Sequence, residues 1–119
     1  MTGVTENDRG ALRPRALTID MRADDEPAIR HWLLHEVPDL IDTGVRSVVL
    51  ELGDRTTVRN GVKGALADAH HTLRAVNGRL VVVTSPAIAI ECARACPDLL
   101  VAATTRQALA ALGIAADVG

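Results

Sequence analysis

Hydrophobic residues gather in two short runs in the middle of the chain, at 48–52 and 79–84. Both runs are rich in valine and leucine, which is typical of strands that are covered on both faces. Residues 16–21 alternate apolar and polar side chains instead, which predicts a strand with one face in solvent. A shorter apolar run at 99–103 predicts a last strand.

Between these runs the apolar positions recur every three or four residues, which predicts amphipathic helices. The expected helices cover 28–43, 60–76, 86–95 and 104–112. Pro38 lies inside the first of them, and because proline lacks a backbone N–H we expect a kink or break there. Strands that alternate with helices favour crossover connections and a largely parallel sheet.

Capping residues mark where these helices should begin. Asn60 is expected to accept a hydrogen bond from the N–H of Val62 or Lys63. Thr104 and Gln107 have the spacing of a capping box. Two further starts are expected where a capping side chain is followed closely by proline, at Asp25 and Ser85.

Length and composition indicate one domain without a nucleic-acid or membrane partner. The chain has 119 residues, 48% of them hydrophobic, and a net charge of -2. Trp32 is the only aromatic residue, so little is available for stacking on bases, and the charge argues against binding to phosphate backbones. No apolar run reaches the roughly 18–20 residues that span a bilayer.

The domain boundaries follow from where the periodic pattern starts and stops. Residues 1–15 are polar and lack the apolar centre of a secretory signal, so they predict a flexible segment or a short edge strand and a cytoplasmic protein. The domain is expected to occupy 16–113, with a tail at 114–119.

The histidines and cysteines do not form a recognisable catalytic or metal-binding pattern. His31 and His35 are one helical turn apart but lack a third ligand with suitable spacing. The adjacent His70 and His71 are expected on the surface, off the apolar stripe. Cys92 and Cys96 are expected to pack in the core as small hydrophobic residues. We therefore expect no enzyme activity, no metal and no cofactor.

The overall pattern resembles the STAS domain, the fold of bacterial anti-sigma factor antagonists, from about Ala16 to Leu112. The resemblance is carried by collinear stretches at 48–52, at Ala65-Leu66 with Leu73, at 77–83 and at 104–112. It implies a single α/β domain with a mostly parallel or mixed sheet of four to five strands and about four helices.

The chain departs from that family at the site of regulation. The loop of STAS proteins normally ends in an Asp-Ser-Ser/Thr-Gly-Leu run, whose first serine is phosphorylated by an anti-sigma kinase. The run Arg59 to Lys63 aligns with it, and Asn60 stands at the serine position. Asn60 has no hydroxyl, and Arg59 reverses the charge of the aspartate. The resemblance therefore implies a degenerate phosphorylation site.

The resemblance also implies a function, that of a non-catalytic protein-interaction module. Its partner would be an anti-sigma factor of the serine-kinase type or another STAS protein, a second copy of the chain included. The expected contact residues are Asp54, Arg55, Thr56, Thr57, Arg59, Asn60 and Lys63. Two alternatives remain open: a STAS subunit that regulates a transporter ATPase, and a small anion or nucleotide binder that uses Arg55, Arg59 and Lys63.

Overall fold

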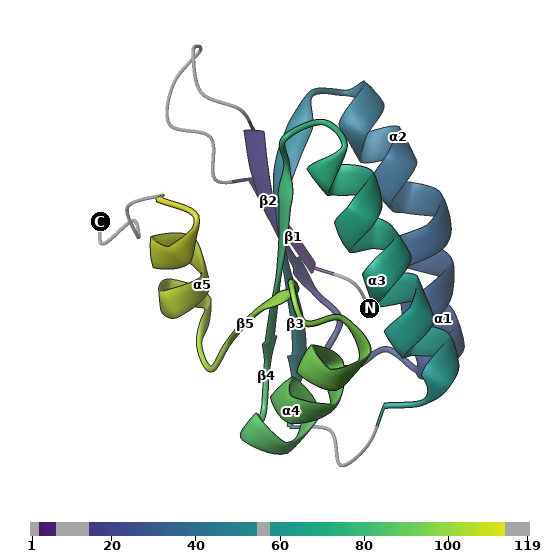
Figure 1. The fold of residues 1–119 in the computed structure, drawn as a ribbon. Coiled ribbons are helices and arrows are strands. Elements are labelled where there is room, and N and C mark those ends of the chain that lie inside the picture. The colour runs from purple at the N-terminus through teal and green to yellow at the C-terminus, as the bar shows by residue number, and fades with distance from the viewer. Residues whose placement is uncertain (1–2, 7–14, 55–57, 114–119) are drawn as a thin grey trace.

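The computed structural model describes residues 3–6, 15–54 and 58–113, and it has the predicted α/β class (Figure 1). Its sheet has five strands in the order β1-β2-β3-β4-β5. β1 pairs with β2 antiparallel, and β2 to β5 are parallel to one another. The strands are β1 Gly3–Glu6, β2 Arg15–Asp20, β3 Val45–Gly53, β4 Arg79–Thr84 and β5 Leu100–Ala102.

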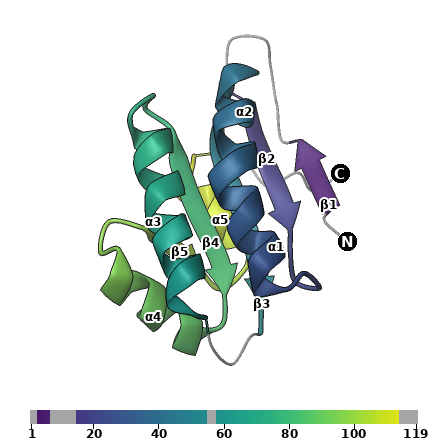
Figure 2. The same ribbon diagram turned by 90° about the vertical axis from the view of Figure 1, so that its right-hand side faces the viewer.

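The helices divide unequally between the two faces of the sheet. They are α1 Glu26–His31, η1 Trp32–Glu36, α2 Val37–Asp42, α3 Asn60–Arg74, α4 Pro86–Ala95 and α5 Thr105–Ala111. The segment from α1 to α2 lies beside α3 over one face, together with α4, whereas α5 lies on the opposite face (Figure 2). Each parallel strand is added on the same side of its predecessor, so right-handed crossovers bring the first three connections to one face.

β3 is the central strand, and its side chains are covered on both faces as the apolar run predicted. Val49 and Leu50 point to opposite faces, and both are fully buried. Leu50 belongs to the large core under α1, α3 and α4. Val49 belongs to a smaller core in which Ala108 and Leu109 of α5 also lie.

β2 differs from the prediction of a strand with one wet face. Leu17 and Ile19 are buried on one face, but Ala16 and Thr18 on the other face are buried too, with only 1% and 8% of their surfaces exposed. β2 is an interior strand, between β1 and β3, and both of its faces are covered at these positions. An alternating pattern cannot distinguish an edge strand from an interior one when the outer residues are small.

The first long helix departs from regular α-helix near Pro38, where a kink or break was predicted, but the irregular segment precedes the proline and the backbone stays helical throughout. Residues 32–36 form a π-helical segment between α1 and α2, and Pro38 sits in the first turn of α2. His31, Glu36 and Val37 all keep right-handed helical φ and ψ at the junctions, so the helix changes its hydrogen-bonding pattern there without leaving the helical conformation. Leu40 and Ile41 are partly buried against the core, so the apolar stripe continues past the irregular segment.

Several predicted helix ends are confirmed by their hydrogen bonds. Asp25 Oδ1 accepts from the N–H of Ala28 at 2.9 Å, and Thr104 Oγ1 accepts from the N–H of Gln107 at 3.1 Å. After α3, Asn77 adopts a positive φ of 62°, and the Gly78 N–H donates to the Leu73 carbonyl at 2.7 Å. This 6→1 bond is the signature of a Schellman motif.

The N-terminal segment contributes the short edge strand that was one of its two predicted forms, β1. Residues 7–14 and the expected tail at 114–119 lie outside the described residues. Of the helices in the described ranges, none combines the length and hydrophobicity that a membrane crossing requires.

Candidate functional site

The candidate site begins at the carboxyl end of β3, where the chain crosses to α3. Asp54 is exposed directly after the strand, and Arg55, Thr56 and Thr57 lie outside the described residues. Val58, only 2% exposed, packs into the large core and anchors the end of the loop. The entry into α3 is therefore held in place by a buried aliphatic side chain.

The start of α3 corrects the predicted cap. Arg59, in an extended conformation, occupies the N-cap position, and Asn60 is the first helical residue. The N–H groups of Val62 and Lys63 both donate to the Arg59 carbonyl at 3.1 Å, not to the Asn60 side chain. Asn60, which the resemblance aligned with a serine, is exposed to solvent.

Glu26 at the start of α1 fixes Arg59. Its Oε1 accepts a 2.6 Å hydrogen bond from the Arg59 backbone N–H, and its Oε2 lies 3.8 Å from the Arg59 Nε. The guanidinium is 86% exposed, so this ion pair is screened by water. The shorter backbone bond, accepted by a charged group, is what ties the end of the loop to α1.

Lys63 in the first turn of α3 pairs with Glu91 of α4, with 3.4 Å between Nζ and Oε1. Both side chains are partly buried. A lysine near a helix N-terminus is opposed by the helix dipole, and the carboxylate across the helix interface offsets that repulsion. This contact also joins the two helices at the mouth of a groove.

We define this α3/α4 groove as a concavity of about 490 Å³. It is lined by Asn60, Lys63, Gly64, Ala67, Glu91, Arg94 and Ala95. Three of these residues are glycine or alanine, and the other four, Asn60, Lys63, Glu91 and Arg94, are polar or charged.

The alternative anion or nucleotide site was expected to use the positive charges of Arg55, Arg59 and Lys63. In this arrangement little of that charge is unpaired among the described residues. Arg59 and Lys63 each lie beside a glutamate, and Arg55 is outside the described residues. Within the described part of the chain, the loop therefore presents paired charges in place of a cluster of free cations.

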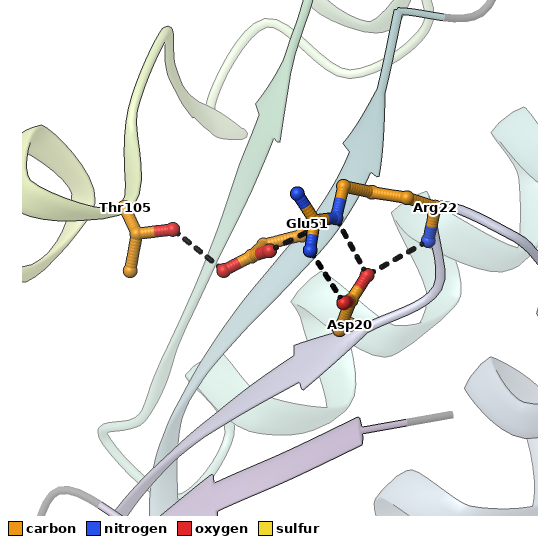
Figure 3. A network of polar contacts seen from close by, with 4 residues as sticks. All are labelled: Asp20, Arg22, Glu51 and Thr105. Atoms are coloured by element: carbon orange, nitrogen blue, oxygen red, sulfur yellow. Dashed lines mark hydrogen bonds and ion pairs between the residues drawn. The ribbon is translucent and has the colours of Figure 1, made fainter. Parts of the chain in front are cut away.

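A polar network braces the strand ends that carry the loop (Figure 3). The guanidinium of Arg22 donates to both carboxylate oxygens of Asp20, with Nε–Oδ1 at 2.9 Å and NH2–Oδ2 at 2.7 Å. The same Nε lies 3.5 Å from Oε2 of Glu51, whose Oε1 accepts a 2.6 Å hydrogen bond from the Thr105 hydroxyl. β2, β3 and α5 are thereby connected at one edge of the sheet.

The network also has an electrostatic and a steric consequence. Hydrogen bonds from the Arg22 side chain and backbone lower the pKa of Asp20 from 3.8 to about 2. The aliphatic part of Arg22 covers Gly53, where a Cβ atom would lie 3.0 Å from Cγ of Arg22. Gly53, with a φ of 73°, turns the chain out of β3 into the loop, so Arg22 packs against the turn that starts the candidate site.

The histidines fall into two groups, one of which corrects the sequence prediction. His31 and His35 are exposed, as expected. His70 was expected on the surface but is buried, with 5% of its surface exposed. It lies on α3 beside Ala69, at the edge of the apolar stripe, where β4 and the segment before β5 complete its surroundings. In the described ranges, no three His, Cys, Asp or Glu side chains are placed to hold a metal ion.

The two cysteines lie in the core, as predicted. Cys92 and Cys96 are reduced and buried, and both belong to the large core cluster. Burial raises the pKa of the Cys92 thiol, with a smaller contribution from Glu91. A neutral, buried thiol is a poor nucleophile.

Comparison with known proteins adds no relative to this picture: no protein-family model and no curated protein matches the chain. The description of the candidate site therefore rests on the sequence and on the geometry of the described residues. The residues that sequence reasoning missed, Glu26, Glu91 and Arg94, belong to other helices than α3. No local pattern pointed to them, because their roles arise only when the helices pack.

Proposed function

We propose that this protein is a non-catalytic interaction module of the STAS type that acts in the cytoplasm like an anti-sigma factor antagonist. The partner is an anti-sigma factor of the serine-kinase type or another STAS protein. It docks on the N-terminal end of α3 and on the α3/α4 groove. Because Asn60 replaces the family's serine, docking is not controlled by phosphorylation at that position.

The observation that carries this proposal is the placement of Asn60 at the mouth of an exposed groove. Asn60 and Gly64 line the groove from α3, and Arg94 and Ala95 line it from α4. Small residues allow another backbone or helix to approach closely, and the polar rim can fix its orientation. The site thus has the form of a docking surface and lacks the enclosed, deep shape of a small-molecule pocket.

The charges around the groove indicate the partner's chemistry. Lys63 and Glu91 largely neutralise each other. Arg94 is exposed on the same rim, and no ion pair to it is found among the described residues. A complementary partner would present a carboxylate or another acceptor to Arg94.

Gly64→Arg tests the groove with little risk to the fold. A Cβ atom at Gly64 would meet nothing within 4 Å, and arginine is a far better helix former than glycine. The new side chain would project into the groove and clash with a docked partner. We expect binding of the captured partner to fall by about tenfold or more, which corresponds to roughly 1.4 kcal/mol.

Ala110→Arg on the exposed side of α5 is the matched control, because it adds the same charge on the opposite face of the sheet. Quantitative pull-down from native cells, with the partner identified by mass spectrometry, gives the readout. Equal binding by the wild type and Gly64→Arg would overturn the docking surface. Recovery of a permease or its ATPase, in place of an anti-sigma factor or STAS protein, would instead support the alternative function as a subunit that regulates a transporter.

A further inference from the structure

The far end of α3 carries a second concavity that the proposed function does not use. We call it the α3/β5 pocket; it has a volume of about 430 Å³. Its polar lining consists of His70, His71, Arg74, Arg79 and Asp98. The volume lies within the roughly 300–1,000 Å³ range of small-molecule sites. About 20 Å of helix separates this pocket from Asn60.

We propose that the α3/β5 pocket binds an oxyanion of the phosphate or sulfate class. Arg74 from α3 and Arg79 from β4 line the pocket and supply two guanidinium groups from different elements. Against them stands one carboxylate, that of Asp98. With both histidines neutral the pocket carries a formal charge of about +1, and each protonated imidazole adds one more. Guanidinium groups bind such oxyanions through paired hydrogen bonds.

His70 gives this pocket an unmet hydrogen-bonding capacity. The side chain is about 95% buried, yet its Nδ1 has no hydrogen-bond partner among the described residues. A buried polar atom without a partner is costly, typically by 1–3 kcal/mol. An oxyanion in the pocket that His70 lines could accept a hydrogen bond from Nδ1–H and so remove that cost.

The end of the α3 helix does not oppose an anion here. Helix C-termini normally repel negative charge through their free carbonyl groups. In α3 the Leu73 carbonyl accepts from Gly78 and Val76, and the Arg74 carbonyl accepts from Asn77. These bonds leave the arginine side chains as the dominant charges near the pocket.

The binding should strengthen as the pH falls. Burial, together with the charges of His71 and Arg74, lowers the pKa of His70, and Asp98 opposes this effect. Arg79 is the remaining charged group that lines the pocket. A bound oxyanion favours the imidazolium, so binding takes up a proton and the pKa of His70 rises in the complex.

Sulfate is the probe of choice, because it keeps its charge of −2 over the pH range in which His70 gains a proton. The full chain is titrated at constant ionic strength, with chloride as the reference, and the imidazole nitrogens are followed by NMR. We expect saturable shifts of the His70 ring nitrogens and tighter binding at about pH 6 than at about pH 8. Absence of saturation at both pH values would overturn the site.

Three variants decide whether the pocket is responsible. Arg79→Gln should weaken sulfate binding by about tenfold, as expected for the loss of one charge-assisted hydrogen bond. Asp98→Asn should strengthen it, because the one opposing carboxylate is removed. Arg106→Gln, on the exposed side of α5 and outside both the pocket and the groove, should leave it unchanged. Equal weakening by Arg79→Gln and Arg106→Gln would mean diffuse charge screening and would refute the pocket.

A final comparison separates a free ion from a phosphorylated metabolite. Glucose 6-phosphate and inorganic phosphate are titrated under the same conditions as sulfate. Tighter binding of the sugar phosphate would identify a phosphomonoester as the ligand class, whereas equal or weaker binding would identify the free oxyanion. Either result supports the site, provided that Arg79→Gln weakens it.

Discussion

At the scale of single residues, stability depends on aliphatic side chains, because Trp32 is the only aromatic residue. Leu50 lies mid-strand in β3 and is fully buried. We expect Leu50→Ala to lower the free energy of unfolding by roughly 2–5 kcal/mol, since it removes apolar contact and leaves a cavity. Denaturant melts measure this loss.

Ile90→Ala serves as the control for Leu50→Ala, because Ile90 is 55% exposed on α4. Its effect on the free energy of unfolding should stay within about 0.5 kcal/mol. A loss below about 1 kcal/mol for Leu50→Ala would show that β3 does not organise the core.

Replacing Gly64 or Gly78 by alanine should change the stability of the protein in opposite directions. Gly64→Ala should stabilise the protein by about 0.4–1 kcal/mol, because the site is helical and a Cβ there would meet nothing within 4 Å. Gly78→Ala should destabilise it by about 1–3 kcal/mol or more, because the Cβ would lie 2.2 Å from the Arg46 carbonyl oxygen. Parallel thermal melts compare the two variants, and equal shifts would contradict the packing of the β3–β4 connection.

How far single residues could be predicted depended on whether their partners were local. Asp25 and Thr104 cap helices through the N–H groups three residues ahead, and the sequence sufficed for both. Asn60 was assigned the wrong position, because Glu26 on another helix fixes the preceding residue. His70 was misplaced for the same kind of reason, since its cover comes from elements distant in sequence.

At the scale of elements, the Asp20–Arg22 pair at the end of β2 makes a testable contribution to acid stability. Folding lowers the pKa of Asp20 to about 2, so the unfolded chain binds the proton more readily. The stabilisation is therefore complete above about pH 5 and is lost as the pH falls through about 2. We expect less than about 1 kcal/mol, because the pair is exposed to solvent.

Urea melts of the wild type and Asp20→Asn over this pH range measure the effect. Their difference in stability should be constant above about pH 5 and should shrink toward pH 2. In an Arg22→Gln background the same comparison should flatten, because the guanidinium that holds the carboxylate is gone. An unchanged pH dependence in that background would assign the effect to another group.

Element boundaries were predictable where the chain carries strong local signals. The run at 79–84 became β4 with the same bounds, and Pro86–Ala95 became α4 as expected. Pro38 signalled an interruption but not its form. The π-helical segment at 32–36 precedes the proline, and its position depends on which side chains of that helix reach the core, a tertiary property.

At the scale of the whole molecule, α3 connects two surfaces of different character. Its N-terminal end lines the α3/α4 groove with small residues and paired charges. Its C-terminal end lines the α3/β5 pocket with arginines and a buried histidine. The two surfaces share no lining residue, so an oxyanion at one end need not alter docking at the other, and the two proposals can fail separately.

The missing hydroxyl at Asn60 predicts how the whole module is regulated. A serine kinase of the anti-sigma type needs a hydroxyl at the start of α3, and the run Arg59 to Lys63 supplies none. We expect incubation with such a kinase to leave this run unmodified, as judged by intact mass and peptide mapping. Asn60→Ser should keep the fold, with a stability change within about 0.5 kcal/mol, because Asn60 is an exposed first-turn residue.

The Asn60→Ser protein also shows what a phosphate would do at this position. It would add a charge of about −1.5 to −2 beside Arg59 and Lys63, in competition with Glu26 and Glu91 for the same cations. Partner binding should therefore change little on modification, unlike a switch that works by repulsion. Stoichiometric phosphate on Thr56 or Thr57 in protein from native cells, together with weakened partner binding, would contradict a constitutive docking surface and would move the switch upstream into the loop.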